Sequence, residues 1–483
     1  MVELYCPGNK RRCMNNGRWY KLEDAENILS RERIYLTREY VNPGMASMFK
    51  MLGFDKLWAH SARGDYIFLE DGRKILDMTG GNCVLGLGHN HPRILAARKH
   101  MAQENRLEIC KSFLSPYVAA LAANMANILP GDLQYSFFCN SGAESIEGAL
   151  KMAEKYQGKK KQGIVYTDHS FHGKTHAAMS ISSMDESRNC FHLLDGCFRI
   201  PYGDAHALRR IVESRTKEKG ESDIGVFVLE AVHGTRLIFP PQGYLKEIRR
   251  ICDEYNIVLI ADEIYTGFGR TGYWFAFESE GIVPDIVCYS KTFGGGKASI
   301  AGYTARKEVF IRAYGAPQDS MIHSSTFSGM SEECATAIEA LNIIKDNNLV
   351  ERSADMGEYL GSRLKELGAK YSKKVKEVRG RGLLWGLELY PLGSKARSLV
   401  EKVAPEKLPI FSKLTGGVVL AELLHSHDIL AYLGFSRRNL VVFSPSLLIE
   451  REDLDKALEG LDEVLAKNWF VLVKNFIGNI LSR

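Results

Sequence analysis

The sequence predicts an α/β protein in which a large domain, built on a mostly parallel sheet flanked by helices, is joined to a small α+β domain formed by both ends of the chain. From about residue 130, short runs rich in β-branched residues alternate with longer amphipathic stretches, which is typical of strands connected by crossover helices. The sequence before residue 90 and beyond about residue 335 does not show this alternation of strands and helices. We therefore expect residues 1–90 and 336–483 to form the small domain and residues 91–335 the large one.

The first predicted element is a hairpin in "GDYIFLEDGRKILDMTGG", residues 64–81. Its two apolar runs flank Asp71-Gly72, and an Asp-Gly pair in this position is a strong turn signal. In the large domain, residues 142–156 and 243–255 carry apolar side chains at helical spacing. The expected strands are residues 134–139, 163–168, 225–232, 256–262 and 285–290.

Composition is that of an ordinary globular protein, with 45% apolar and 25% charged residues among 483. A net charge of +5 disfavours a nucleic-acid surface. The ten cysteines show no repeated metal-ligand spacing, and Cys6 and Cys13 are too loosely placed to be half of a zinc site, so we expect free thiols and no metal. We find no signal peptide and no run of 18 apolar residues, which favours a cytoplasmic protein.

Ligands bind beyond the carboxyl ends of parallel strands, so the residues that follow each predicted strand are candidates for a site. Two of these strands are followed by residues that suit a phosphorylated, aromatic ligand. "NSGAES" opens a helix after residue 139, and a helix N-terminus binds phosphate; the alternative is a simple N-cap by Asn140 or Ser141. "HSFHGKTH" follows residue 168 and offers the ring of Phe171 with His172 beside it. The alternative there is an ordinary surface loop.

Two further strands end in an acid and an amine. "DEIYTGFGRTG" starts with Asp262, which is either a turn residue or a carboxylate held at the edge of the sheet, with Ile264 two residues later. "DIVCYSKTFGGG" places Lys291 before three glycines. Lys291 is either an exposed lysine at a strand end or a buried amine whose lowered pKa makes it a nucleophile toward a carbonyl.

A phosphate site, a ring, an acid and an amine on one sheet edge are together what pyridoxal 5′-phosphate requires. We expect Lys291 to bond to the cofactor aldehyde and then to move the proton of the substrate carbon. Asp262 would pair with the pyridine nitrogen and keep it protonated, while Phe171 and Ile264 would pack on the two faces of the ring. The backbone of Ser141, Gly142 and Ala143 would hold the phosphate.

Six stretches in order give the chain a family resemblance: "LGLGHNHPRI", "CNSGAESIEGALKMA", "FHGKTHAA", "PPQGYLKEIRRICDEYNIVLIADEIYTGFGRTG", "DIVCYSKTFGGG" and "STFSG". From about residue 40 to about residue 465 the chain resembles the class III aminotransferases, which are fold-type I pyridoxal-phosphate enzymes. Within that family, "VNPG" and "QYSFFCNSGAESIEGALKMAEKYQ" look most like the putrescine aminotransferase branch.

The resemblance implies a homodimer whose active sites lie at the subunit interface. It implies that Thr326 of "STFSG" reaches the phosphate at the other subunit's site, and that Gly80, Gly81 and Asn82 lie near the substrate entrance. The implied cofactor shell is Ser141, Gly142, Ala143, Phe171, His172, Asp262, Ile264, Tyr265, Lys291 and Thr326.

Three departures from the family pattern concern the substrate. Tyr265 stands where the family usually has a Gln near the phenolic oxygen of the cofactor, and a phenol can still donate a hydrogen bond there. "EAVHGTRL" has His233 and Thr235 in place of the usual Gln and second Glu, followed by Arg236. "LVVFSPSLL" has Val442 in place of the Arg that binds an α-carboxylate.

We therefore expect transfer of an amino group between an amine or amino-acid donor and a carbonyl acceptor, with at least one substrate lacking the usual α-carboxylate. Val442 and Phe443 would supply an apolar wall. Arg236 either binds a carboxylate from a new direction or faces solvent. Alternatives are a racemase, epimerase or decarboxylase on the same scaffold, or a non-catalytic binding protein, which Lys291 and Asp262 argue against.

The last segment, "VLAKNWFVLVKNFIGNILSR", predicts an apolar helix from residue 465 onward. We expect it to pack on its own small domain or across the dimer, because such stripes usually face a core; a membrane or partner anchor is the alternative. Its apolar residues are Leu465, Trp469, Phe470, Leu472, Val473, Phe476, Ile477, Ile480 and Leu481.

Overall fold

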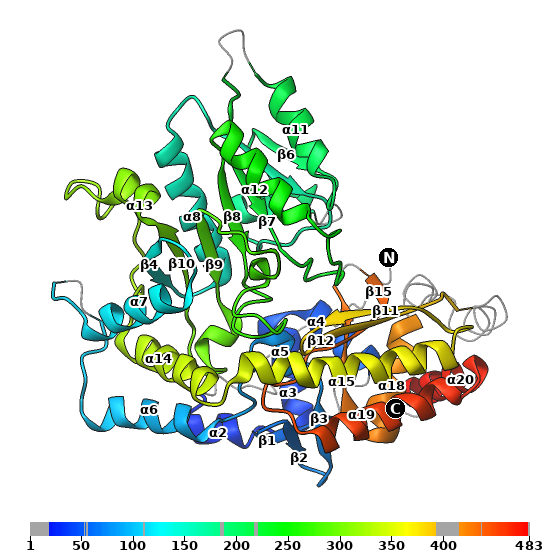
Figure 1. Ribbon diagram of the computed structural model, residues 1–483. Coiled ribbons are helices and arrows are strands. Elements are labelled where there is room, and N and C mark those ends of the chain that lie inside the picture. Colours follow the sequence, from blue (N-terminus) through cyan, green and yellow to red (C-terminus); the bar gives the residue numbers. More distant parts are fainter. Residues whose placement is uncertain are drawn as a thin grey trace, which may run out of the picture.

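Figure 1 shows the computed structural model, which describes residues 19–52, 54, 57–109, 112–183, 188–216, 221–392, 415–435 and 437–481. Cys6 and Cys13 lie outside the described residues. A seven-stranded sheet in the order β4-β10-β9-β8-β7-β5-β6 forms the upper part of Figure 1. Its strands are β4 (Leu133–Cys139), β5 (Gly163–Thr167), β6 (Cys197–Ile200), β7 (Ile224–Leu229), β8 (Val258–Asp262), β9 (Ile286–Tyr289) and β10 (Ala301–Arg306).

The mostly parallel sheet that the sequence predicts is confirmed. β6, β5, β7, β8 and β9 pair in parallel, whereas β10 lies antiparallel between β4 and β9. The sequence did not reveal β10, because a glycine in a strand interior weakens the β pattern. Gly302 is required there, since a Cβ atom would come within 2.7 Å of the Phe137 carbonyl oxygen. β7 ends at Leu229, three residues before the expected end.

Helices cover both faces of this sheet because side chains alternate along each strand. On β7, Val226 and Val228 pack in the core beneath α8 (Gly142–Gln157), while Phe227 and Leu229 face the core that includes α12 (Tyr244–Tyr255). Both helices begin and end within one residue of the predicted ranges. Among the described residues before 349, the other α-helices are α2 (Leu22–Glu26), α3 (Ser30–Leu36), α4 (Pro43–Leu52), α5 (Gly80–Cys83), α6 (Pro92–Gln103), α7 (Pro116–Ile128), α9 (His176–Ser180), α11 (Ala205–Ser214), α13 (Lys307–Tyr314) and α14 (Ser331–Asp346).

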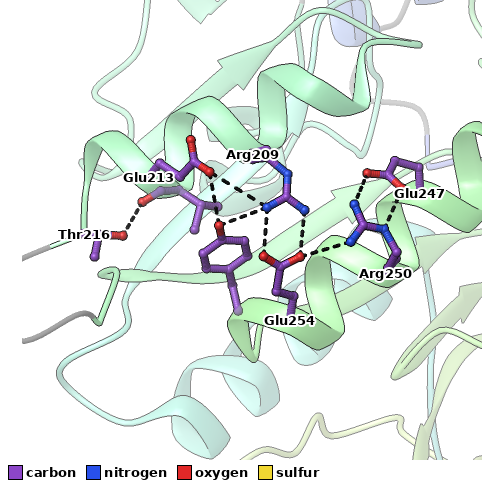
Figure 2. Close-up of polar contacts among 8 residues, drawn as sticks. Arg209, Glu213, Thr216, Glu247, Arg250 and Glu254 are labelled. Carbon is purple, nitrogen blue, oxygen red and sulfur yellow. Dashed lines mark hydrogen bonds and ion pairs between the residues drawn. The ribbon is translucent and has the colours of Figure 1, made fainter.

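α11 and α12 are joined on their outer side by charged side chains (Figure 2). Arg209 of α11 donates two hydrogen bonds to Glu254 of α12, at 2.8 and 2.7 Å, and Arg250 bonds both Glu254 and Glu247. Exposed ion pairs of this kind contribute about 0–1 kcal/mol each. They orient two surface helices and lie on the outside of the sheet.

Two four-stranded sheets form the lower part of the molecule. The first contains β1 (Ala59–Arg63), β2 (Tyr66–Leu69), β3 (Lys74–Asp77) and β13 (Ile429–Leu430), and it confirms the predicted hairpin, with Gly72 at φ 87° in the turn. β13 pairs with β3, so segments from both parts of the sequence share this sheet. The domain boundaries near residues 90 and 335 stay a prediction.

The second small sheet carries one wall of the site described below. Its order is β11-β12-β15-β14, with α15 (Leu349–Lys370), α18 (Thr415–His427) and α19 (Arg451–Ala466) around it. The strands are β11 (Val375–Arg381), β12 (Leu384–Leu389), β14 (Tyr432–Gly434) and β15 (Arg437–Phe443).

The C-terminal helix α20 (Trp469–Leu481) packs on α18, as one of the two expected alternatives has it. Leu472, Val473 and Phe476 are buried, whereas Phe470 and Val471 are exposed. Asn475 donates to the buried carboxylate of Glu422 on α18. No helix among the described residues is long and apolar enough to cross a membrane. The side chains of Ile480 and Leu481 lie outside the described residues.

Candidate active site

Lys291 lies just beyond the carboxyl end of β9, in a left-handed conformation with φ 51°. Such a backbone is uncommon for a residue with a side chain and is found most often at functional sites. Burial lowers the pKa of the Lys291 amine, although the neighbouring Cys83, Asp262 and Glu230 act in the opposite direction. The amine is therefore closer to its neutral, nucleophilic form than an exposed lysine.

Asp262 ends β8 on the same edge of the sheet and is buried. Its Oδ2 lies 2.7 Å from Nδ1 of His172, and its Oδ1 accepts a hydrogen bond of 3.0 Å from the Ile264 N–H. Burial alone would lower the pKa of His172, but the hydrogen bond and the charge of Asp262 outweigh it and raise that pKa. His172 and Asp262 thus form one buried acid–imidazole pair.

The N-terminus of α8 lies at the end of β4. Ser141 caps it, and its hydroxyl accepts a hydrogen bond from the Glu144 N–H at 3.3 Å. The N–H groups of Gly142 and Ala143 have no acceptor within the helix, as at every helix start. Gly142 is required because a Cβ atom there would meet the Ile264 side chain at 2.9 Å. A phosphate-sized anion therefore has N–H donors and a positive helix end beside Ile264.

Glu230 follows β7 and was not singled out from the sequence. It is buried, and its two carboxylate oxygens accept hydrogen bonds of 2.9 Å from the N–H groups of Phe171 and Gly234. Glu230 therefore joins the loop that carries Phe171 and His172 to the loop after β7. The rule that reveals Asp262, a polar residue directly after a buried strand, also applies to Glu230.

His233, Thr235 and Arg236 contact the loop after β5. His233 Nε2 donates to the Asp168 carbonyl oxygen at 3.0 Å, and the Thr235 hydroxyl donates to the His169 carbonyl oxygen at 3.0 Å. Arg236 is half-buried and lies 3.2 Å from His169 Nε2. These three side chains hold the segment that leads to Phe171.

Val442 lies in a small apolar cluster between the large sheet and β15. Cys83, Leu237, Leu384 and Leu440 are its buried members, and Phe239, Tyr265 and Tyr432 pack against it. Tyr265 shares a hydrogen bond with Tyr432, and the Lys291 Nζ lies 5.1 Å from the centre of the Tyr265 ring. The expectation that Phe443 shares this wall is wrong, because consecutive strand residues face opposite sides and Phe443 belongs to the main core.

The segment before Cys83 turns sharply beside β15. Gly81 and Asn82 have φ near 57° and 58°, and both are exposed. A Cβ atom on Gly80 would lie 2.4 Å from the Ser444 carbonyl oxygen, so only glycine allows this close approach. Thr326 is exposed in a loop that reaches the α8 N-terminus, where the Asn140 side chain donates to the Phe327 carbonyl oxygen at 3.3 Å.

The model of the family "aminotransferase class-III" matches residues 54–465. The chain belongs to the class III aminotransferases. Its structure is similar to that of the ornithine aminotransferase from Toxoplasma gondii, with 25% identity over 93% of this chain and 99% of that one and a TM-score of 0.78. A transaminase from the marine bacterium Virgibacillus is 26% identical over 87% of this chain and 94% of its own, with a TM-score of 0.75.

A third similar structure is an (S)-enantioselective omega-transaminase from Thermomicrobium roseum, with 26% identity, coverage of 85% and 92%, and a TM-score of 0.73. Class III aminotransferases use pyridoxal phosphate, and the site of this member of the family fits that group. A buried carboxylate, an amine of lowered pKa and an open helix N-terminus lie at the ends of β8, β9 and β4, on one edge of the sheet. When bound, pyridoxal phosphate supplies an aldehyde that carries the amino group and a ring that accepts electrons.

Proposed function

We propose that this aminotransferase moves an amino group between an amine donor and a carbonyl acceptor, at least one of which lacks an α-carboxylate. The observation that carries the proposal is the apolar cluster around Val442, because Tyr265 packs against it and the centre of the Tyr265 ring lies 5.1 Å from the Lys291 Nζ. A carboxylate buried against such a surface without a cation loses several kcal/mol of solvation. An apolar amine, aldehyde or ketone does not incur that loss.

In this proposal Lys291 and Asp262 are the catalytic residues. The Lys291 amine would hold the cofactor covalently and, when free, would take a proton from the substrate carbon and return it. Asp262 would accept a hydrogen bond from the ring nitrogen of the cofactor. The contact between His172 and Asp262 holds the carboxylate in its orientation. The hydrogen bond and the charge of Asp262 raise the pKa of His172, which favours the charged form of the imidazole.

The remaining assignments follow the resemblance to the family. Ser141, Gly142 and Ala143 bind the phosphate, and Phe171 and Ile264 lie on the two faces of the ring. Thr326 completes the phosphate site of a second subunit. The exposed apolar residues of its loop, Met321, Ile322 and Phe327, support a homodimer contact there.

The substrate pocket is proposed to include Gly81, Asn82, Tyr265 and Val442. His233, Thr235 and Arg236 act on it through the Asp168–His169 segment. The contact between Arg236 and His169 favours this supporting role over a new carboxylate anchor. Putrescine is one donor to test, because the chain resembles the putrescine branch and because an omega-transaminase and an ornithine aminotransferase are among the similar structures.

The visible spectrum of the purified holoenzyme tests the proposal. An amine donor added without acceptor should remove the absorbance of the lysine-bound cofactor and yield pyridoxamine 5′-phosphate, and a carbonyl acceptor should restore the absorbance. Turnover without pyridoxamine phosphate would instead indicate a racemase or decarboxylase. A holoenzyme that no amine or amino acid converts would contradict the proposed function.

A further inference from the structure

Four oxygens form a hydrogen-bonded chain that starts beside Lys291 and crosses into the small domain. The Tyr265 hydroxyl bonds the Tyr432 hydroxyl, which lies 3.0 Å from the Ser444 hydroxyl. Ser444 in turn donates to the Thr79 carbonyl oxygen at 2.8 Å. The members come from the loop after β8, from β14, from the end of β15 and from the turn before α5.

The proton positions in this chain follow from counting donors. A carbonyl oxygen only accepts, and each hydroxyl has a single proton to donate. Ser444 donates its proton to Thr79, so it accepts from Tyr432. Tyr432 then has no proton left for Tyr265, and the Tyr265 hydroxyl must donate to Tyr432. All three protons are therefore donated along the chain from Tyr265 toward Thr79.

The side chains that pack around Tyr265 are mostly apolar. Cys83 is a buried member of the cluster against which Tyr265 packs. Val442 is the register partner of Tyr432 across β14 and β15, and Leu237 and Leu440 pack in the same cluster. In this order the Tyr265 proton goes to Tyr432; donation from the Tyr265 phenol toward the cofactor stays a prediction.

We propose that Tyr432 is a specificity-determining residue, because it takes the Tyr265 proton and so withholds this hydrogen-bond donor from the wall beside Lys291. This inference rests on the proposed function and narrows its substrate class. A substrate ammonium or hydroxyl group can donate to the Tyr265 oxygen. A substrate carboxylate, which only accepts, loses its bonds to water there and gains none.

Two isosteric variants separate this role from simple packing. Tyr432→Phe removes the acceptor, so the Tyr265 proton becomes available to the site. Tyr265→Phe removes that proton altogether. We would measure the binding of 3-phenylpropionate, an unreactive carboxylate, to both holoenzymes and to the wild type by isothermal titration calorimetry, with thermal unfolding as the check on folding.

Tyr432→Phe should bind 3-phenylpropionate about tenfold more tightly than the wild type, since a hydrogen bond to a charged group is gained. Tyr265→Phe should bind it no more tightly than the wild type. No gain in Tyr432→Phe, or equal gains in both variants, would overturn the proposal. If Tyr432→Phe does not fold, Ser444→Ala replaces it, because this variant removes the acceptor that fixes the order of the protons. Ser444→Ala should then bind 3-phenylpropionate roughly threefold more tightly than the wild type. No gain in affinity would again overturn the proposal.

This binding measurement needs no turnover. Its failure is therefore distinct from failure of the proposed function, which would appear as a wild-type holoenzyme that no amine or amino acid converts to the pyridoxamine form.

Discussion

The two sides of the site differ in how they are built. The edge of the large sheet holds Lys291, Asp262 and the α8 N-terminus, each placed directly by the end of a strand. The opposite wall comes from β14, β15 and α5, where Val442, Tyr432 and Cys83 meet through contacts between distant parts of the chain. The first side carries the two proposed catalytic residues, Lys291 and Asp262, and the second carries Val442, one of the chain's departures from the family pattern.

We infer from this difference that the reaction and the choice of substrate depend on different residues. Changes on the sheet edge should abolish the reaction for every substrate. Changes on the small-domain wall should alter which substrates react and leave the chemistry in place.

Lys291→Ala should have the largest effect. Turnover should fall by roughly 10⁴-fold or more, because both the covalent bond and the proton transfer are lost. The fold should be retained, which circular dichroism and thermal unfolding check. Borohydride reduction of the wild type, followed by peptide mass spectrometry, should find the cofactor attached to Lys291. Attachment to another lysine would contradict the assignment of Lys291.

Asp262→Asn should lower kcat by roughly 10³-fold for amines and amino acids alike, because an amide cannot hold the ring nitrogen protonated. The variant should still bind the cofactor, as its absorbance after gel filtration would report. A loss of only a few-fold would show that another group supplies the negative charge.

Phe476→Ala tests whether α20, which packs on α18, contributes to stability alone. Phe476 is 5% exposed, and its loss should cost about 3–5 kcal/mol of unfolding free energy in urea titrations. The matched control is Phe470→Ala on the same helix, where 53% of the residue is exposed and a change within about 0.5 kcal/mol is expected. Equal losses in the two variants would contradict the packing of α20 on α18.

The His172–Asp262 pair should give the smallest effect, a dependence of stability on pH. The pKa of His172 is raised in the folded protein, so the pair's contribution is fully present below about pH 6.5, the unfolded value, and is lost as the pH rises through the folded pKa. The stability difference between the wild-type apoprotein and His172→Asn should therefore shrink from pH 6 to pH 9. A difference that grows with pH would mean that His172 is neutral.

The sheet edge was predictable from the sequence because its placement rule is local. Parallel strands bring their carboxyl ends together, so Asp262 and Lys291 could be assigned to one edge from the strand pattern alone. The wall was not predictable to the same degree. Tyr265 and Tyr432 are 167 residues apart, Ser444 and Thr79 are 365 apart, and β14 has only three residues, too few for a periodic signal.

The prediction of an apolar wall was right for Val442 and wrong for its neighbour Phe443. Its apolar surroundings agree with the expectation from the sequence, whereas Phe443 faces the main core because neighbouring strand residues point in opposite directions. β6 and β10 were not predicted from the sequence, because each contains a single β-branched residue.

The most direct test of the account compares amines with their α-carboxylated analogues. The pairs 2-phenylethylamine and phenylalanine, butylamine and norvaline, and putrescine and ornithine each differ by one carboxylate, and kcat/KM would be measured for all six with the wild type and Val442→Arg. We predict that the wild type prefers the amine of each pair it accepts, and that Val442→Arg reverses this order by supplying a cation for the carboxylate. A wild type that prefers the carboxylated compounds, and loses that preference in Arg236→Ala, would contradict the account and place the carboxylate anchor at Arg236.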